Sequence, residues 1–306
     1  MRLVFAGTPD AAVPSLRRLA DSAHDLVLVV TRPDAPLGRK RVMTPSPVAQ
    51  AAADIGLDVL KTARLDDEAT ARILAHRPDL GVVVAYGGLV REPLLSAPAH
   101  GWVNLHFSLL PRWRGAAPVQ HALIAGDERT GAAVFRLVHD LDAGDVYAQL
   151  EHPIPPEATA GDLLGDLAER GAQLLADVVD AIADGTAQAH PQEGEPTSAP
   201  KLTLDDARVR WDEAAPAVLA RIRGVSPEPG AFTTIDGARL KILRARPATA
   251  DQRPAPGVVL LDGRDVLVGT ATTPLVVDVV QPAGKGAMAA ADWWRGVRAA
   301  DPRVGT

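Results

Sequence analysis

The chain contains no cysteine among its 306 residues. Without thiols it forms no disulfide, uses no thiolate in catalysis, and binds neither zinc nor an iron–sulfur cluster through cysteine. Proteins that depend on any of these groups are therefore excluded.

Long hydrophobic runs are also missing. No apolar stretch approaches the ~18 residues expected of a membrane span. The opening residues, MRLVFAGTPD, hold one Arg and a short apolar run before a turn. They lack the longer apolar core and the cleavage site of a signal peptide. We therefore expect a cytoplasmic protein, and nothing in the sequence argues for more than a monomer.

An overall excess of positive charge is absent, since the net charge is −6. The charge is uneven, however. Residues 1–204 hold 18 Lys or Arg against 26 Asp or Glu, whereas residues 205–306 hold 14 against 12. This asymmetry permits a positive face in the C-terminal part toward a polyanion, although it does not demonstrate one.

What is present is typical of a folded protein, with 47% hydrophobic and 23% charged residues. The length favours two domains. A segment with three prolines and little apolar content, HPQEGEPTSAPKLTLDD (190–206), has the composition of a linker. We expect a catalytic domain over residues 1–189 and a second domain over residues 207–306.

Apolar strand-like runs alternate with helical patterns in the first domain. The expected strands are 2–7, 26–31, 57–62, 80–87, 102–107 and 131–138, and the expected helices 12–22, 46–56, 66–77 and 159–185. Strands separated by helices predict a Rossmann-like, doubly wound and mostly parallel sheet, whose ligand cleft lies at the carboxyl ends of the strands. In the second domain, short strands punctuated by Asp-Gly turns predict a small β-barrel or sandwich.

The turn FAGTPD (5–10) follows a strand and opens a helix, as in dinucleotide-binding proteins. It has one Gly where the fingerprint needs three, and Pro9 lacks the N–H that would meet a phosphate. We therefore expect an ordinary strand–helix turn.

Asn104 and His106 stand near the end of a predicted strand and face the same way, because strand side chains alternate. Such a pair often satisfies only local backbone groups. It also suits an electrophilic clamp, in which an amide N–H and an imidazole N–H stabilise the oxygen of an attacked carbonyl.

A cluster of Asp140, Asp142 and Asp145 follows the strand at 131–138. Such Asp/Gly clusters are usually solvated turns, and this one lacks the length and terminal Glu of a calcium loop. Because it lies at the same sheet edge as His106, Asp142 is expected to orient His106 and to assist proton removal. No Ser, Cys or Lys is placed as nucleophile, which favours direct transfer, and no metal-ligand spacing is found.

These residues resemble a known family. NLH, SLLPRWRGAAP and LDAGD, in that order, are similar to the signature of the folate-dependent formyltransferases. RLVFAGTPD, RWRGAAP and IRGVSPEPGAF resemble its tRNA-directed members over essentially the whole chain. The resemblance implies a formyltransferase fold with an OB-like C-terminal barrel that binds tRNA. It also implies 10-formyltetrahydrofolate as donor, and the α-amine of methionine on initiator tRNA as acceptor.

The resemblance also implies roles for individual residues. Asn104 and His106 would stabilise the oxyanion, and Asp142 would hold His106 and accept the proton. The folate site would be formed by Ser108, Leu109, Leu110, Pro111, Tyr86, Gly87, Leu89, Val90 and Leu141. The tRNA contacts would be a basic loop at residues 32–47 and the terminal domain, through Arg32, Arg39, Lys40, Arg41, Arg114, Arg221, Arg223 and Lys285. No metal is expected, because no cluster of His or carboxylate residues shows ligand spacing.

The chain departs from the family pattern at Gly88, His139, Asp140, Glu228 and Gly286, none of which belongs to the catalytic trio. Two other readings remain open. One is a related enzyme that formylates a small amine with the same site. The other is a non-catalytic RNA-binding protein that uses the basic loop and the barrel, and it leaves the Asn/His/Asp trio without a purpose.

Overall fold

The computed structural model describes residues 1–38, 41–249, 251–297 and 302–305. Two compact units are present. The first comprises Met1–Pro118, Thr130–His152 and Leu164–Ala199, and the second comprises Val119–Arg129, Pro153–Leu163 and Pro200–Thr306. The boundaries expected at residues 189 and 207 remain a prediction.

The first unit is built on a seven-stranded sheet with strand order β5-β2-β1-β6-β7-β8-β9. Its strands are β1 (Arg2–Gly7), β2 (Asp25–Thr31), β5 (Val59–Lys61), β6 (Leu80–Val84), β7 (Trp102–His106), β8 (Arg129–Arg136) and β9 (Val146–Pro153). Neighbouring strands from β5 to β7 are parallel, and β8 pairs antiparallel with β7. The expected doubly wound sheet is confirmed.

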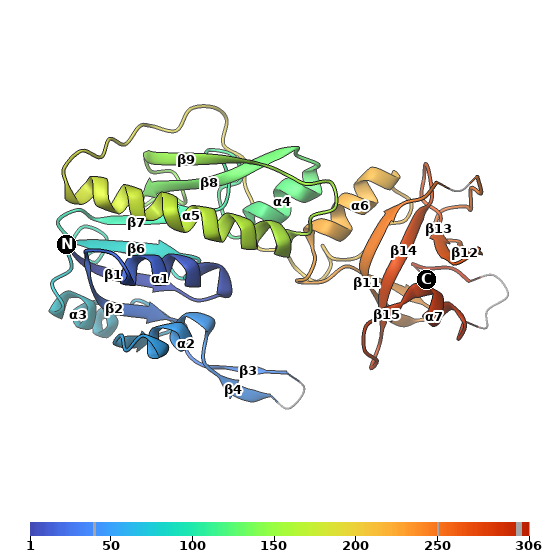
Figure 1. Cartoon of the computed structure of the whole chain (residues 1–306), viewed down its shortest axis with the longest axis horizontal. Helices are drawn as coiled ribbons and strands as arrows, with labels where there is room; N and C mark the ends of the chain where they lie inside the picture. The colour runs from blue at the N-terminus through green and yellow to red at the C-terminus, as the bar shows by residue number, and fades with distance from the viewer. Residues whose placement is uncertain (39–40, 250, 298–301, 306) are drawn as a thin grey trace. The chain divides into compact units, whose positions relative to one another are not determined.

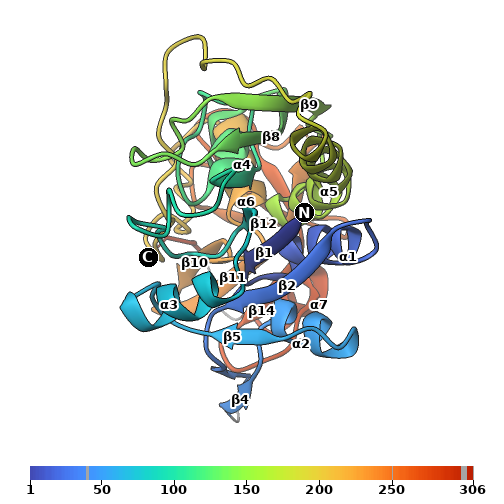
Figure 2. The same ribbon diagram turned by 90° about the vertical axis from the view of Figure 1, so that its left-hand side faces the viewer.

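Helices cover both faces of this sheet, with α1 and α5 on one side and α3 on the other (Figure 2). The helical segments of this unit are η1 (Asp10–Ala12), α1 (Val13–Ala20), α2 (Pro47–Asp54), α3 (Asp67–Ala75) and most of α5 (Ala160–Ala183), whereas α4 (Pro118–Ala125) belongs to the second unit from Val119 on. Local signals begin two of them. The side chains of Ser46 and Asp66 accept hydrogen bonds from the N–H groups of Ala49 and Ala69, as N-caps do.

The central strands are buried because their residues are almost all apolar. Every residue of β6 is buried, and the ring of Trp102 packs against Gly81, where a Cβ atom would lie 2.1 Å from the ring. The Trp102 indole N–H donates to the carbonyl of Leu94 at 2.8 Å. This packing fixes β6 and β7 side by side, and thereby the sheet edge at which both strands end.

Residues 32–47, expected as a basic loop, contain a hairpin of β3 (Ala35–Leu37) and β4 (Val42–Thr44), which stands out from the sheet in Figure 1. Three of its apolar side chains are exposed, namely Leu37, Val42 and Met43. Arg39 and Lys40 lie outside the described residues.

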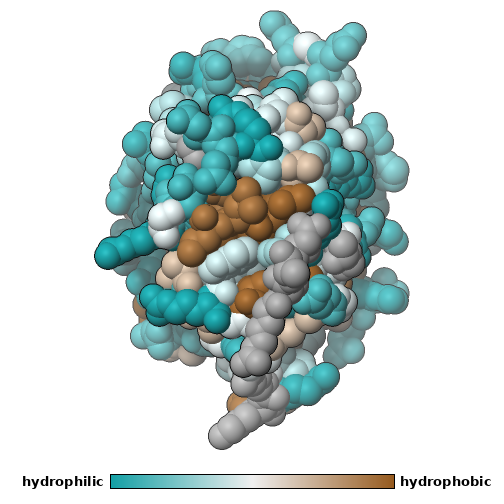
Figure 3. Space-filling view, turned by 90° about the vertical axis from the view of Figure 1, so that its right-hand side faces the viewer, coloured by the Kyte–Doolittle hydropathy of each residue, from teal (hydrophilic) through white to brown (hydrophobic). Residues whose placement is uncertain are grey.

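The second unit contains an antiparallel sheet with order β10-β11-β14-β13-β12, and β15 pairs with β14. Its elements are α6 (Ala215–Gly224), β10 (Phe232–Ile235), β11 (Ala238–Pro247), β12 (Val259–Asp262), β13 (Asp265–Val268), β14 (Leu275–Pro282), β15 (Met288–Ala289) and α7 (Ala290–Trp294). Helix α6 packs on β11 through Val218 and Ile222 in a core shared with Ile242. One face of this unit carries a group of hydrophobic residues among hydrophilic ones (Figure 3).

Candidate active site

Strand β7 brings Asn104 and His106 to the carboxyl end of the parallel sheet. They pair with Phe135 and Ala133 of β8, so both project from the same face two residues apart. The strand ends at His106, and the chain then turns through Ser108, whose hydroxyl donates to the carbonyl of Arg112 at 2.6 Å. That local bond explains why an apolar strand is followed by a turn instead of a helix.

The imidazole of His106 is buried, with 5% of the residue exposed. Its Nε2 atom lies 2.8 Å from the carbonyl oxygen of Trp113, and its ring meets that of Phe135 edge-on. Burial lowers the pKa of His106 below its ordinary 6.5, while the charge of Asp142 and the bond to Trp113 oppose this shift. Because a carbonyl can only accept, the neutral imidazole carries its proton on Nε2, and Nδ1, 3.8 Å from Asp142 Oδ2, keeps a free lone pair.

Asp142 completes the pair from the loop between β8 and β9. Its residue is 7% exposed, and its Oδ2 atom lies 3.8 Å from His106 Nδ1 and accepts a hydrogen bond from the Gly115 N–H at 2.7 Å. The backbone of Asp142 has φ 49, a left-handed conformation that non-glycine residues adopt only where the surroundings enforce it. Asp142 thus lies near His106, but the shared strand edge expected from the sequence is not the reason, because β8 is antiparallel to β7 and its last residue, Arg136, pairs with Val103.

Asn104 is half-buried, and its Oδ1 atom is buried without a hydrogen-bond partner among the described residues. A buried amide oxygen without a partner is costly, so such a group usually serves a ligand or a bound water. The Asn104 amide oxygen is therefore free to bind a substrate group or a water, and Asn104 projects from the same face of β7 as His106.

The residues expected around the folate differ in their exposure. Leu89 and Leu141 are large apolar side chains that are each 61% exposed, so they are free to contact a flat apolar ligand. Tyr86 is buried and donates to the carbonyl of Thr62 at 3.2 Å, and burial raises its pKa. The other positions stay candidates for the folate site. Gly87 is exposed, Leu109, Pro111 and Val90 are half-buried, and Ser108 and Leu110 are buried.

The departure at Gly88 has a packing reason. A Cβ atom at this position would lie 2.6 Å from the ring of Tyr86. The buried tyrosine therefore occupies the space that a larger residue would need.

The cations expected to meet tRNA are placed differently from one another. Arg41 and Lys285 are exposed, whereas the guanidinium of Arg32 donates to the carbonyl of Ala63. Arg114 is bound to Gln192.

The two α6 cations are turned toward their own unit. Arg221 donates to the carbonyl of Asp206 at 3.1 Å and lies 3.9 Å from the carboxylate of Glu213. Arg223 donates to the carbonyl of Pro156 at 2.7 Å, and burial lowers its pKa. These four arginines thus have structural partners, and their contact with tRNA stays a prediction.

Several contributors to the site carry no sequence signal. The carbonyl of Trp113 and the N–H of Gly115 are backbone groups, and Gln192 lies in the stretch that reads as a linker. In the second unit, the guanidinium groups of Arg208 and Arg239 both lie over the ring of Phe232, at 5.2 and 4.3 Å. These two arginines were not singled out from the sequence.

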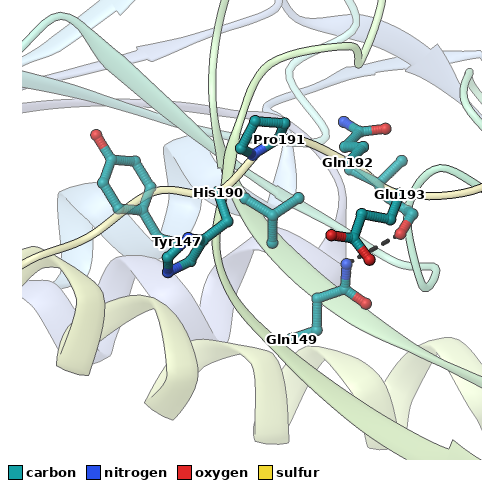
Figure 4. Close-up of a pocket in the computed structure, with 8 residues that line it drawn as sticks. Tyr147, Gln149, His190, Pro191, Gln192 and Glu193 are labelled. Atoms are coloured by element: carbon teal, nitrogen blue, oxygen red, sulfur yellow. Dashed lines mark hydrogen bonds between the residues drawn. The ribbon is translucent and has the colours of Figure 1, made fainter.

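A cavity of about 340 Å³ lies next to the site, on the side of β9 (Figure 4). It is lined by Leu110, Val146, Tyr147, Gln149 and residues 190–193, and the amide of Gln149 donates to the carbonyl of Leu110 at 3.0 Å. In the described part of the chain, no group of three or more His, Asp or Glu is placed to hold a metal ion. None of the described helices is both long and apolar enough to cross a membrane.

Comparison with known proteins defines the class. A family model described as formyl transferase matches residues 1–179, and a second, described as formyl transferase, C-terminal domain, matches residues 201–298. The chain therefore belongs to the formyl transferase family, as its resemblance to the folate-dependent formyltransferases predicted.

Full-length relatives narrow the assignment. The chain is 62% identical over 296 residues to a methionyl-tRNA formyltransferase of Leifsonia xyli subsp. xyli, covering 97% of each chain. It is 63% identical over 303 residues to one of Clavibacter sepedonicus, covering 98% of this chain and 99% of the other. Within the family, the chain thus groups with the methionyl-tRNA formyltransferases.

Solved structures share the fold at low identity. A methionyl-tRNA formyltransferase from Clostridium thermocellum aligns with a TM-score of 0.59 at 13% identity, covering 94% of this chain and 100% of that one. WlaRD, a sugar 3N-formyl transferase, aligns with a TM-score of 0.65 at 14% identity, covering 94% and 99%. HypX from Aquifex aeolicus, in complex with tetrahydrofolic acid, aligns with a TM-score of 0.66 at 18% identity over 96% of this chain and 46% of HypX.

Proposed function

We propose that this protein transfers the formyl group of 10-formyltetrahydrofolate to the α-amine of methionyl initiator tRNA and so supports translation initiation. The chain groups with the methionyl-tRNA formyltransferases, at 62% identity to one of them over nearly its whole length, and this supports methionyl-tRNA as the acceptor of the formyl group. The contact of His106 with Asp142, two residues along the chain from Asn104, whose amide oxygen has no partner among the described residues, is the observation that carries the chemistry.

The reaction begins when the neutral amine attacks the formyl carbon. A new C–N bond forms, and the carbonyl electrons move onto oxygen, where the Asn104 amide N–H donates a hydrogen bond. The proton of the attached amine passes to the His106–Asp142 pair. Expulsion of N10 of tetrahydrofolate, which takes up a proton, then restores the carbonyl of the formylated amine.

The tautomer of His106 determines whether its Nδ1 atom first accepts or first donates a proton. Because Nε2 donates to Trp113, the free Nδ1 lone pair accepts a proton before it donates one. Once protonated, Nδ1–H is a donor for the oxyanion, and the nearby carboxylate of Asp142 stabilises the imidazolium. The lowered pKa of His106 keeps the imidazole neutral and ready to accept.

The test is formylation of charged initiator tRNA by the purified protein with 10-formyltetrahydrofolate, followed by analysis of the released amino acid. We expect N-formylmethionine. Asn104→Ala and His106→Ala should each lower kcat by about 10²–10³ while folate still binds, because each removes a group that acts on the developing charge.

Gln188→Ala is the matched control, since Gln188 is exposed and lies outside the site. Absence of formylation by the wild-type protein rejects the proposed function. Unchanged kcat in both variants would reject the clamp while leaving the acceptor assignment intact.

A further inference from the structure

Residues 190–199, which we call the strap, lie against both loops that build the site. At one end, Val146 and His190 exchange backbone hydrogen bonds of 2.8 and 2.9 Å. At the other end, the backbone N–H of Arg114 donates to the carbonyl of Thr197 at 2.8 Å, and the backbone N–H of Ala199 donates to the carbonyl of Arg114 at 2.7 Å. The strap therefore connects the start of β9 with the segment that follows β7.

Gln192 is the side chain of the strap that reaches into both loops, and Figure 4 shows it between Pro191 and Glu193. Its Nε2 atom donates to the carbonyl oxygens of Asp142 and Gly144, each at 2.8 Å. Its Oε1 atom accepts from Nε and Nη2 of Arg114, at 3.1 and 2.7 Å. Both donor hydrogens and the acceptor oxygen of the amide are thus in use.

Arg114 lies between the two residues whose backbone groups bind His106 and Asp142. These are Trp113, whose carbonyl accepts a hydrogen bond from His106 Nε2, and Gly115, whose N–H donates to the Asp142 carboxylate. The Gln192 amide therefore connects the backbone of Asp142 to the segment that orients both His106 and Asp142.

The loop that carries Asp142 needs an anchor of this kind. His139, Asp140 and Leu141 are exposed, and Asp142 itself holds a left-handed conformation. A strained backbone persists only where its surroundings over-determine it. The two bonds from Gln192 fix the carbonyls on either side of Ala143 and so oppose relaxation of the loop.

We propose that Gln192 is a positioning residue that holds the Asp142 carboxylate at its distance from His106. This inference rests on the proposed function for its assay. It assigns to the segment with linker composition a part in the chemistry of the first unit.

The test is a double-mutant cycle on the full-length protein, with formylation of charged initiator tRNA as the assay. Gln192→Ala should lower kcat on the order of 10- to 100-fold, since small misplacements of a catalytic group have effects of this size. The KM values for folate and tRNA should stay near those of the wild type. In an Asp142→Asn background, Gln192→Ala should cause little further loss, because the group that it positions is already disabled.

Gln192→Glu separates positioning from packing. It keeps the shape of the side chain and an acceptor for Arg114, but it loses the donors to Asp142 and Gly144. We expect Gln192→Glu to be as impaired as Gln192→Ala, and Gln188→Ala to behave as the wild type.

Three outcomes would overturn the inference: full activity of Gln192→Glu, an equal loss from Gln192→Ala with and without Asp142, or a rise in KM without a fall in kcat. Should Gln192→Ala not fold, the near-isosteric Gln192→Glu decides alone, by its kcat with and without Asp142→Asn. Failure of the wild-type protein to formylate would instead reject the proposed function, so the two failures are distinguishable.

Discussion

At the scale of single residues, the site depends on how buried polar atoms are paired. His106 binds the carbonyl of Trp113 and faces Asp142, while the amide oxygen of Asn104 has no partner among the described residues. A buried, neutral imidazole beside a carboxylate is suited to accept a proton and hold it near the reacting oxygen.

The lowered pKa of His106 predicts a pH dependence of stability. Burial disfavours the charged imidazole in the folded state, so the unfolded chain binds more protons once the pH falls below the unfolded pKa of about 6.5. The contribution of the neutral, buried His106 to the free energy of unfolding is therefore complete above the unfolded pKa. It is lost as the pH falls from the unfolded pKa to the lower pKa of the folded state.

His106→Gln should flatten this acid limb, because its amide still donates to Trp113 but does not titrate. Denaturant unfolding between pH 7 and pH 5 measures how the free energy of unfolding changes with pH in the wild type and in the variant. The two slopes should differ by at most about 1.4 kcal/mol for each pH unit. Parallel curves for the variant and the wild type would show that His106 titrates alike in both states.

At the level of secondary structure, the proposed catalytic residues come from one strand end and one loop. Strand β7 supplies Asn104 and His106, and the β8–β9 loop supplies Asp142. The β3–β4 hairpin lies elsewhere along the chain, and Arg41, which directly precedes β4, is exposed. The proposed chemistry and the tRNA contact proposed for the hairpin thus belong to different elements and can be tested separately.

Replacing Arg39, Lys40 and Arg41 with Gln should raise the KM for charged tRNA and weaken its salt dependence, because fewer phosphates are neutralised. The KM for folate and the unfolding midpoint should not change. Arg170→Gln, on the exposed side of α5, is a matched loss of positive charge outside the hairpin. If the triple variant changed only the KM for folate, the hairpin would have to be reassigned.

At the scale of the whole molecule, the charge is divided between the two parts of the chain. Residues 205–306 hold 14 basic against 12 acidic residues in a protein of net charge −6. A net negative protein that binds a polyanion depends on local cationic surface, and such binding releases counterions.

We therefore expect the KM for tRNA to rise steeply with salt concentration, while the KM for the small folate donor changes far less. Steady-state rates over a salt series, with each substrate varied in turn, measure both. Equal salt responses for the two substrates would argue that salt acts on the protein as a whole.

Much of the fold followed from local patterns. The expected helices over 66–77 and 159–185 correspond to α3 (Asp67–Ala75) and α5 (Ala160–Ala183). Strand 80–87 is shorter than expected, because Ala85 takes a positive φ and ends β6 at Val84. Periodicity reveals an element but not the residue at which the backbone turns.

Apolar runs in the sequence were enough to predict the buried, mostly parallel sheet and to put Asn104 and His106 at the carboxyl end of β7. Asp142 follows β8, which is antiparallel to β7, so its approach to His106 depends on the path of the β8–β9 loop and not on parallel strand ends. The partners that hold these residues are likewise known only from the folded structure. The Trp113 carbonyl, the Gly115 N–H and the Gln192 amide are recruited by contacts across the fold, and Gln192 bonds to Asp142 from 50 residues away. Backbone groups are the same at every position in a chain, so their choice as partners depends on three-dimensional packing and leaves no local signal.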